Sequence, residues 1–394
     1  MRLTFIALTA TLFLQHCAID DPDPAVDIPE QTGDTLVLRT QKVRGTDLFG
    51  FGAGFLDFGS TDGLFPYPVT YPSDLSGIEG ARTSPDFRDE DPDYIDIITG
   101  SRDGEKVFVV DQNNNQDFTD DPVRSFAPVM PDGSQSLLCY FRRGQGTETI
   151  RDSSWIQIAT SKLLGPEAIL YARDEHLRAT VTHDGISYQL GVVDPFMSRT
   201  FTYSPTAELA ILAIDGTGRD SLSRHDIVTT GEYLKLGDDM YRFDSITHYG
   251  EYLTLVRDGK FAHTEGTQVG MLAPAFTFLS VSGDTVSSAR LRDKPTIVAN
   301  SCGCGGDTLS GAAFTDIRNT YGPRIHALRL DSGLGEPTGQ WTVDFAEPYN
   351  KDLFQHYRGE YCSRIAYLIG EDRRILEKFD IGDWSRALAK HLRP

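Results

Sequence analysis

Short runs in which apolar and polar residues alternate fill the first two thirds of the chain. Such runs occupy residues 35–38, 106–110, 155–158, 208–212 and 252–256, between clusters of Gly, Asp, Asn and Pro. Alternation with a period of two is typical of half-buried strands, and helical periodicity is scarce here. The pattern therefore predicts a β-rich, sandwich-like region over residues 34–265, built as one antiparallel sandwich or as two.

The pattern changes from residue 268 to residue 394, where strand signals alternate with helix signals. A hairpin is expected around 276–286, a buried strand at 296–300 and a helix at 308–321, which Gly322 and Pro323 stop. Further elements are expected as a strand at 325–330, a helix at 351–357, strands at 365–369 and 375–379, and a final helix at 383–392. This order predicts an α/β domain whose sheet is covered by helices.

Size and charge narrow the classes of function. A chain of 394 residues is long enough for more than one domain. Its formal net charge of -20 argues against a basic patch that binds nucleic acid or an anionic membrane surface. We therefore expect no nucleic-acid partner.

The first residues read as an export signal. Arg2 is followed by an apolar stretch over 3–14, which is too short to span a bilayer, and Cys17 comes soon after it. The run that ends at Cys17 resembles the lipobox of bacterial lipoproteins, although His16 stands where a small residue is usual. We expect residues 1–17 to be a signal peptide that ends in a lipidated cysteine, and residues 18–33 to be a flexible tether. The protein is then expected in the cell envelope, in the periplasm or on the outer surface. If Cys17 is lipidated, the lipid anchor would be the only contact with the membrane. An ordinary secretory peptide that is cleaved nearby is the alternative, and in either case the mature protein is exported.

Four further cysteines are too few for a disulfide scaffold. They are Cys139, Cys302, Cys304 and Cys362. Cys304 lies between an apolar strand and a predicted helix, where free backbone N–H groups and the helix dipole favour the thiolate and can lower a thiol pKa from about 8.5 to about 7 or below. Cys304 is therefore the candidate nucleophile, and an inert, buried small side chain is the alternative.

Two phrases of the C-terminal part resemble the redoxin group of the thioredoxin fold, which contains membrane-anchored TlpA-like thiol-disulfide reductases and the peroxiredoxins. Residues 270–276 resemble the opening phrase G-x-x-A-P-x-F of that group, and residues 291–295 resemble its phrase L-R-G-K-P. In an ungapped match Cys304 falls on the first cysteine of the C-x-x-C motif, and Asp307 replaces the second. The resemblance implies a thioredoxin-like domain over residues 268–394 that exchanges thiols and disulfides.

Other residues partly compensate for the lost cysteine. The run from Ser301 to Cys304 resembles the Ser-Cys-Thr-selenocysteine run of the iodothyronine deiodinases. Arg364, just before a predicted strand, resembles the arginine that steadies the peroxidatic thiolate of peroxiredoxins. A mixed disulfide on Cys304 needs a resolving thiol, and both Cys302 and Cys362 qualify.

The sequence thus predicts an enzyme, an exported and lipid-anchored thiol-disulfide oxidoreductase. Its expected partners are protein thiols or disulfides and, as a further candidate, a membrane redox donor, with no required cofactor. A peroxiredoxin-like thiol peroxidase that uses Cys304 and Arg364 is one alternative. A non-catalytic envelope-binding protein with a degenerate redoxin domain is another, and copper(I) held by the cysteines with His326 or His356 is a third.

One acidic loop in the β-rich region carries oxygen ligands at alternate positions. Asp111, Asn113, Asn115 and Asp117 have the spacing that calcium sites use. Gln116 stands where a calcium hand has glycine, and Pro122 where it has its bidentate glutamate. A solvated turn rich in Asn and Asp is the competing interpretation, because both residues tolerate left-handed conformations.

Overall fold

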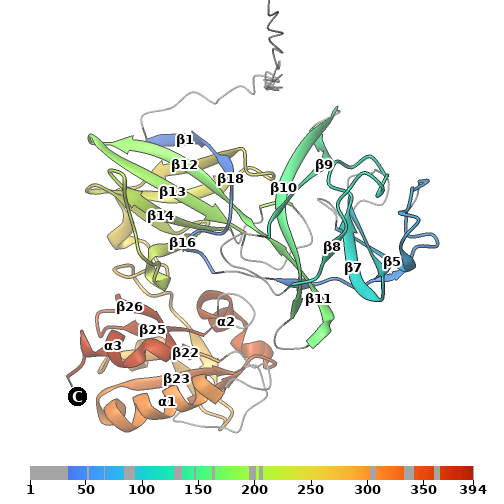
Figure 1. The fold of residues 1–394 in the computed structure, drawn as a ribbon. Coiled ribbons are helices and arrows are strands. Elements are labelled where there is room, and N and C mark those ends of the chain that lie inside the picture. The colour runs from blue at the N-terminus through green and yellow to red at the C-terminus, as the bar shows by residue number, and fades with distance from the viewer. Residues whose placement is uncertain are drawn as a thin grey trace, which may run out of the picture.

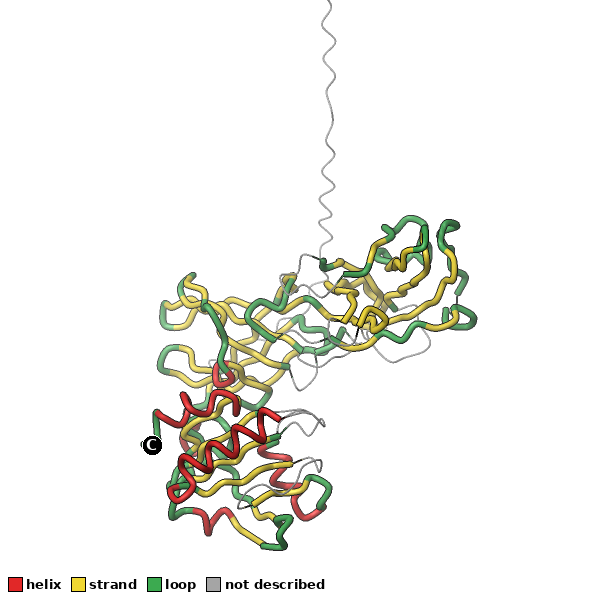
Figure 2. The backbone as a smooth tube through the Cα atoms, turned by 60° about the horizontal axis from the view of Figure 1, so that its bottom comes forward, coloured by secondary structure: helices red, strands yellow, loops and turns green. Residues whose placement is uncertain are grey.

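The computed structural model describes residues 34–50, 53–65, 67–83, 94–127, 135–145, 148–161, 165–194, 201–203, 207–301, 308–331, 341–358 and 364–393. These residues form a β-rich region followed by an α/β domain, which confirms the fold class expected from the sequence (Figures 1 and 2). No helix among them is long and apolar enough to cross a membrane.

Two sheets that face each other form the first sandwich. One sheet has the order β1-β19-β18-β17, and the other has the order β15-β14-β13-β12-β2 with β16 paired to β14. Leucines from both sheets, among them Leu177, Leu190, Leu209 and Leu253, are buried in a shared core. The strands are β1 (Thr35–Arg39), β2 (Gln41–Arg44), β12 (Glu175–His183), β13 (Ile186–Val193), β14 (Glu208–Ile214), β15 (Thr217–Gly218), β16 (Ile227–Thr229), β17 (Tyr233–Leu236), β18 (Asp239–Ile246) and β19 (Tyr252–Arg257).

The second sandwich is inserted between β2 and β12 of the first. Its sheets have the orders β3-β11-β10-β9 and β4-β5-β6-β7-β8. Ile95, Ile97, Phe141 and Ile156 are fully buried between them. The strands are β3 (Gly54–Phe55), β4 (Gly59–Ser60), β5 (Ser76–Thr83), β6 (Ile95–Arg102), β7 (Glu105–Val110), β8 (Arg124–Ser125), β9 (Leu137–Gln145), β10 (Glu148–Ser161) and β11 (Gly165–Arg173).

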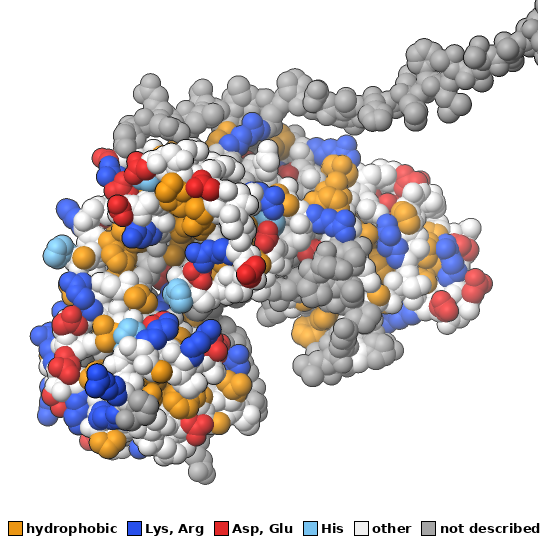
Figure 3. All heavy atoms as spheres, turned by 60° about the vertical axis from the view of Figure 1, so that its left-hand side comes forward, with side chains coloured by type: hydrophobic (Ala, Val, Ile, Leu, Met, Phe, Trp, Pro, Cys, Tyr) orange, Lys and Arg blue, Asp and Glu red, His pale blue; other side chains and the backbone are white. Residues whose placement is uncertain are grey.

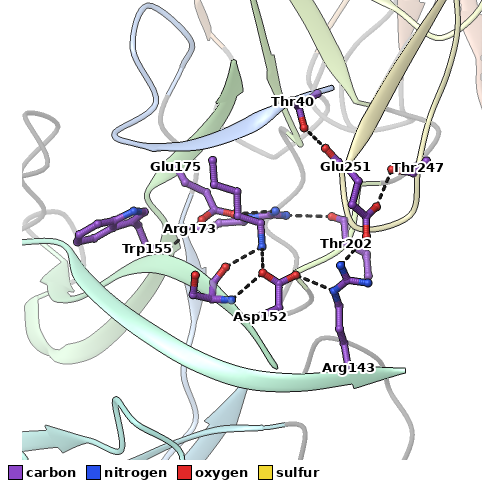
Figure 4. A network of polar contacts seen from close by, with 12 residues as sticks. Thr40, Arg143, Asp152, Trp155, Arg173, Glu175, Thr202, Thr247 and Glu251 are labelled. Carbon is purple, nitrogen blue, oxygen red and sulfur yellow. Dashed lines mark hydrogen bonds and ion pairs between the residues drawn. The ribbon is translucent and has the colours of Figure 1, made fainter. Parts of the chain in front are cut away.

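Charged side chains join the two sandwiches where the chain passes between them (Figure 4). Asp152 of β10 accepts a hydrogen bond from Lys42 of β2 and another from Arg143 of β9, each at 2.7 Å. Arg143 also pairs with Glu251 of the first sandwich. Burial alone would raise the pKa of Asp152, but the two cations hold that pKa below its usual range. The carboxylate therefore stays charged, and the ion pairs tie the sandwiches together.

A five-stranded mixed sheet forms the centre of the C-terminal domain. Its order is β24-β23-β22-β25-β26, with β22 parallel to β23 and antiparallel to β25. A helix crosses from β22 to β23, as parallel neighbours require. The strands are β20 (Thr277–Leu279), β21 (Thr285–Ser287), β22 (Thr296–Asn300), β23 (His326–Asp331), β24 (Trp341–Asp344), β25 (Ile365–Ile369) and β26 (Ile375–Asp380), and the helices are α1 (Thr308–Tyr321), α2 (Lys351–Tyr357) and α3 (Trp384–Ala389).

Both faces of this sheet are covered, which explains why β22 and β25 are apolar throughout. Ile297 and Ala299 of β22 pack with α1 and α3 on one face, around Phe314 and Leu388. Val298 points to the other face, where α2 and the β20–β21 hairpin lie. Single turns of 3-10 helix supplement these elements at Arg224–Asp226, Phe261–His263, Ser288–Leu291, Gly322–Arg324, Pro348–Asn350 and Ile381–Asp383.

The structure matches the expected elements of this domain closely, apart from shifts of one residue at strand ends and two larger differences. The strand at 296–300 and the helices at 308–321 and 351–357 have the expected bounds. The last helix is shorter than the expected 383–392: a 3-10 turn, Ile381–Asp383, precedes α3, and α3 already ends at Ala389. The edge strand β24 (Trp341–Asp344) was not expected, since a run of four residues carries little periodicity.

Candidate functional site

The carboxyl ends of the parallel strands define one edge of the C-terminal sheet. β22 ends at Asn300 and β23 ends at Asp331, and the two strands pair in register. Ser301 continues this pairing, because its N–H donates to Leu330 O at 3.0 Å and its Oγ donates to the same oxygen at 3.3 Å. The expected nucleophile segment therefore leaves the sheet from a buried, hydrogen-bonded serine, and α1 begins at Thr308.

Asn300 is the buried polar residue on which this edge depends. It ends a strand whose five residues are all buried, and it is itself 2% exposed. Its Nδ2 donates to Tyr357 O at 2.7 Å and to Ile365 O at 2.8 Å. One amide group thus links the end of β22 to the end of α2 and to the start of β25.

The opening phrase of the domain lies beneath the same edge. Tyr357 is fully buried, and its hydroxyl donates to Pro274 O at 2.7 Å. Its ring also meets the ring of Phe276 at 5.4 Å between centroids. Burial raises the pKa of Tyr357, so the hydroxyl stays a hydrogen-bond donor. Residues 274 and 276 of the G-x-x-A-P-x-F phrase therefore support the residue that Asn300 holds.

Arg364 lies at this edge, as its place before β25 implies. Ala366 of β25 pairs with Ala299 of β22, so the start of β25 lies beside the end of β22. The guanidinium of Arg364 lies 3.5 Å from the carboxylate of Asp380, and both side chains are more than 40% exposed, at 41% and 43%. Its carbonyl oxygen accepts a hydrogen bond from Ile381 N at 2.9 Å. Arg364 thus brings a positive charge to the edge, and Asp380 partly compensates it.

Most of the predicted thiol chemistry lies outside the described residues. This applies to Cys302, Cys304 and Asp307, to Cys362, and to Cys17 with the rest of the N-terminal segment. The flanking residues that are described are Ser301 and Thr308 on one segment, and Arg358 and Arg364 on the other. Ser301 follows β22 and Arg364 precedes β25, and these two strands are paired. The described residues that flank the two cysteine-bearing segments therefore lie at one edge of the sheet.

Cys139 is a different kind of cysteine. It is fully buried in the core of the second sandwich, beside Phe141 and Tyr171. Burial raises the pKa of its thiol well above the usual range. Such a thiol is a small apolar side chain and not a nucleophile.

His326 lies away from the candidate site. It begins β23 and pairs with Thr296, the first residue of β22, so it lies at the opposite end of the strand from Asn300. Its Nε2 lies 2.7 Å from the carboxylate of Asp293. The copper alternative itself stays a prediction, because the cysteines that it needs lie outside the described residues.

The acidic loop after β7 folds through its own side chains. Asp111 is buried and accepts hydrogen bonds from Asn115 N at 3.1 Å and Gln116 N at 2.8 Å. Asn113, Asn115 and Asp117 each accept a backbone N–H two residues further on, at 2.9 to 3.0 Å. Gln116 adopts a φ of +67°, the left-handed conformation that glycine takes in a calcium hand. The four side chains thus lie in one loop, and calcium binding there stays a prediction.

Within the described residues, one cluster has the composition of a transition-metal site. His183 Nε2 lies 3.0 Å from Asp239 Oδ2 and 3.5 Å from Asp184 Oδ2, at neighbouring hairpin tips of the first sandwich. Asp239 is also paired with Arg257 at 2.7 Å. These residues are remote from the sheet edge that carries Ser301, and the arrangement reads as a surface ion-pair cluster.

Three comparisons with known proteins were made. No protein-family model matches the chain, and no curated protein matches it. Among solved structures, the chain is similar to the thioredoxin domain of a thiol-disulfide oxidoreductase from Bacteroides vulgatus, with 17% identity, a TM-score of 0.25, and coverage of 30% of this chain and 95% of that one. It is also similar to a thiol:disulfide interchange protein from a Bacteroides species, with 18% identity, a TM-score of 0.25, and coverage of 33% and 91%. A thioredoxin-like protein from Bacteroides caccae matches with 17% identity, a TM-score of 0.26, and coverage of 32% and 51%.

These likenesses are too low to carry an activity to this chain. The class of the domain follows from its own geometry, a mixed sheet of order β24-β23-β22-β25-β26 with helices on both faces. The chain therefore contains a thioredoxin-like domain behind a double β-sandwich region.

Proposed function

We propose that the protein is an exported, lipid-anchored thiol-disulfide oxidoreductase that acts through Cys304. One observation carries the proposal. Asn300 binds the backbone at both Tyr357 and Ile365, and so it holds together the bases of the segments that contain Cys304 and Cys362. Fixing two reactive groups near each other is what an intramolecular exchange requires.

The first step is attack by the Cys304 thiolate on a sulfur of a substrate disulfide. An S–S bond forms between enzyme and substrate, the substrate S–S bond breaks, and the departing thiolate takes a proton from water. The position before α1, a helix of 14 residues, favours the thiolate, and the partly compensated charge of Arg364 adds to that preference.

The second step is resolution of the mixed disulfide by another thiolate of the same chain. Cys302 and Cys362 remain the two candidates. Attack by either on the Cys304 sulfur forms an internal disulfide and releases the reduced substrate. A dithiol donor then supplies the two electrons that return the enzyme to its reduced form.

Exposed apolar side chains at the same edge favour a polypeptide partner. Leu309, in the first turn of α1, is 46% exposed. Phe345, directly after the carboxyl end of β24, is 54% exposed, and its ring lies 5.2 Å from that of Phe354. Large exposed apolar residues beside a reactive segment suit the side chains of a protein disulfide better than a small hydrophilic oxidant.

The peroxidase alternative uses the same nucleophile and the charge of Arg364. The pairing of Arg364 with Asp380 reduces the effect of the guanidinium on a nearby thiolate, which counts more against the peroxidase because only that alternative gives Arg364 a required role. Lipidation at Cys17 and a location in the cell envelope remain part of the proposal and rest on the lipobox-like run.

Turnover of a model peptide disulfide and of hydrogen peroxide tests the proposal. The wild-type chain is compared with Cys304→Ser, Cys302→Ser and Cys362→Ser, and Cys139→Ala serves as the control for a thiol outside the site. We expect disulfide turnover to vanish in Cys304→Ser and to persist in Cys139→Ala. Consumption of peroxide without disulfide turnover would favour the peroxidase alternative. If neither substrate is consumed, the remaining alternative is the non-catalytic envelope-binding protein.

A further inference from the structure

A cavity of about 420 Å³ lies between the first sandwich and the thioredoxin-like domain. Its walls come from both parts, with Val228 and Leu234 on one side and Val269 with Lys378 on the other. This volume falls within the range of small-molecule sites, which occur preferentially at domain interfaces. It shares no lining residue with the cysteine-bearing sheet edge.

Hydrogen bonds and an ion pair hold the two walls together. The side-chain amide of Gln268 makes two hydrogen bonds to the backbone of Tyr233. Its Oε1 accepts from Tyr233 N, and its Nε2 donates to Tyr233 O at 2.9 Å. Lys378 of β26 pairs with Glu232 at 2.8 Å, and their side chains are only 7% and 15% exposed. The cavity is therefore a preformed feature of the docked domains, which lowers the cost of binding a ligand.

The chemistry of the lining is apolar with an excess of positive charge. Apolar residues such as Ile211, Val228, Leu234, Met240 and Phe261 supply much of the surface. The charged lining residues are four cations, Arg219, Lys235, Lys378 and Lys390, and two acids, Asp226 and Glu377. Figure 3 shows basic, acidic and histidine side chains side by side around the junction of the two parts.

Three of the four lining cations form ion pairs with acidic side chains. Arg219 pairs with Asp226, Lys390 with Glu377, and Lys378 with Glu232 from beyond the lining. In the part of the chain that is described, no acidic side chain pairs with Lys235, an exposed residue of the cavity lining. An unpaired cation over an apolar floor stands out in a chain whose net charge is -20.

We propose that this cavity binds a small organic monoanion with an apolar body, such as a carboxylate or sulfonate that carries an aromatic or aliphatic group. The apolar part would lie against Met240, which pairs with Lys235 across the β17–β18 hairpin, and against Val269, and Lys235 would face the negative charge. Because the ligand would contact both walls, its binding would also stabilise the docked arrangement of the two parts.

Two fluorescent probes that differ in charge test this site in the full chain. Anilinonaphthalene sulfonate has an apolar body and one negative charge, and N-phenylnaphthylamine has nearly the same body without the charge. We expect saturable binding of the anionic probe at one site per chain. Lys235→Glu should weaken that binding by about tenfold or more and leave the neutral probe unaffected. The matched control is Lys351→Glu, which makes the same change of charge at the exposed start of α2.

Blocking the space gives a second test that does not depend on charge. Val269 lines the cavity and is 42% exposed, so Val269→Trp should fill the cavity, leave the fold intact and abolish binding of both probes. Val281→Trp is the control, since Val281 is 51% exposed and lies outside the lining. Equal binding in Val269→Trp and wild type, or an anionic probe that is indifferent to Lys235→Glu, would overturn the proposal. Neither outcome bears on thiol exchange by Cys304.

Discussion

The side-chain amide of Asn300 donates at 2.8 Å to the carbonyl oxygen of Ile365, which lies 65 residues further along the chain. The same nitrogen donates to Tyr357 O at 2.7 Å. Both carbonyls are satisfied by a side chain at the point where β22, α2 and β25 meet. A buried amide that closes three chain segments is expensive to lose, because its partners cannot reach water.

Replacing Asn300 by Ala should therefore destabilise the chain. Two buried carbonyl oxygens would lose their donors, and we expect a loss of about 2 to 4 kcal/mol in the free energy of unfolding. Urea unfolding measures it, with Asn319→Ala on the exposed side of α1 as the matched control. If the two variants unfold at the same urea concentration, Asn300 does not hold this edge.

Cys139 should not react with thiol reagents in the native chain. It is fully buried and its pKa is raised by that burial, so little thiolate forms and no reagent reaches it. Maleimide labelling mapped by mass spectrometry should find Cys139 modified only in urea, whereas Cys304 should be labelled without it. Labelling of Cys139 in the native chain at the rate of an exposed thiol would contradict the buried position.

Asp121 should make the stability of the second sandwich depend on pH. Burial is the main cause that raises the pKa of Asp121 from 3.8 to about 6 in the folded chain. The folded chain then binds this proton more tightly than the unfolded chain, so the stability contributed by protonation is present at low pH and is lost as pH rises through about 6.

The variant Asp121→Asn removes this titration. We expect it to stabilise the chain at neutral pH and to have little effect near pH 4, as measured by thermal unfolding at both values. The control is Asp62→Asn at an exposed turn. A gain for Asp121→Asn that is the same at both pH values would mean that the carboxylate does not carry the effect.

Phe345 should matter for large substrates and not for small ones. Its exposed ring lies at the end of β24, on the same edge as Ser301. Phe345→Ala should raise KM for a peptide disulfide several-fold, by roughly the 1 kcal/mol or more that a buried aromatic contact contributes, while the rate with a small dialkyl disulfide stays unchanged. Ile214→Ala, at another exposed apolar residue, is the control. Equal losses with both substrates would place Phe345 in the fold of the site and not in recognition.

Local patterns predicted the C-terminal domain well because its elements are encoded locally. The apolar run of β22, the stop at Gly322 and Pro323, and the spacing of α1 need no distant contact to be recognised. The edge strand β24 cannot be recognised from the sequence, because its four residues carry too little periodicity. The role of Asn300 could only be suspected, from a polar residue at the end of an apolar strand, since both of its partners are more than 50 residues away.

In the β-rich region, the sequence pattern predicts strands but not which strands pair. Its strands could be recognised from alternation, but their pairing could not. β2 pairs with β12 although Arg44 and Glu175, which face each other, are separated by the whole inserted sandwich. Such pairings depend on tertiary packing that a periodic pattern does not contain. The cavity between the sandwich and the thioredoxin-like domain was hidden for the same reason.

The most direct test of the central claim is to trap the first intermediate. In a chain that carries both Cys302→Ser and Cys362→Ser, the mixed disulfide cannot be resolved, and mass spectrometry after exposure to a peptide disulfide locates the adduct. We predict one peptide joined to Cys304. An adduct elsewhere, or no adduct on a folded chain, would contradict the assignment of Cys304 as the nucleophile.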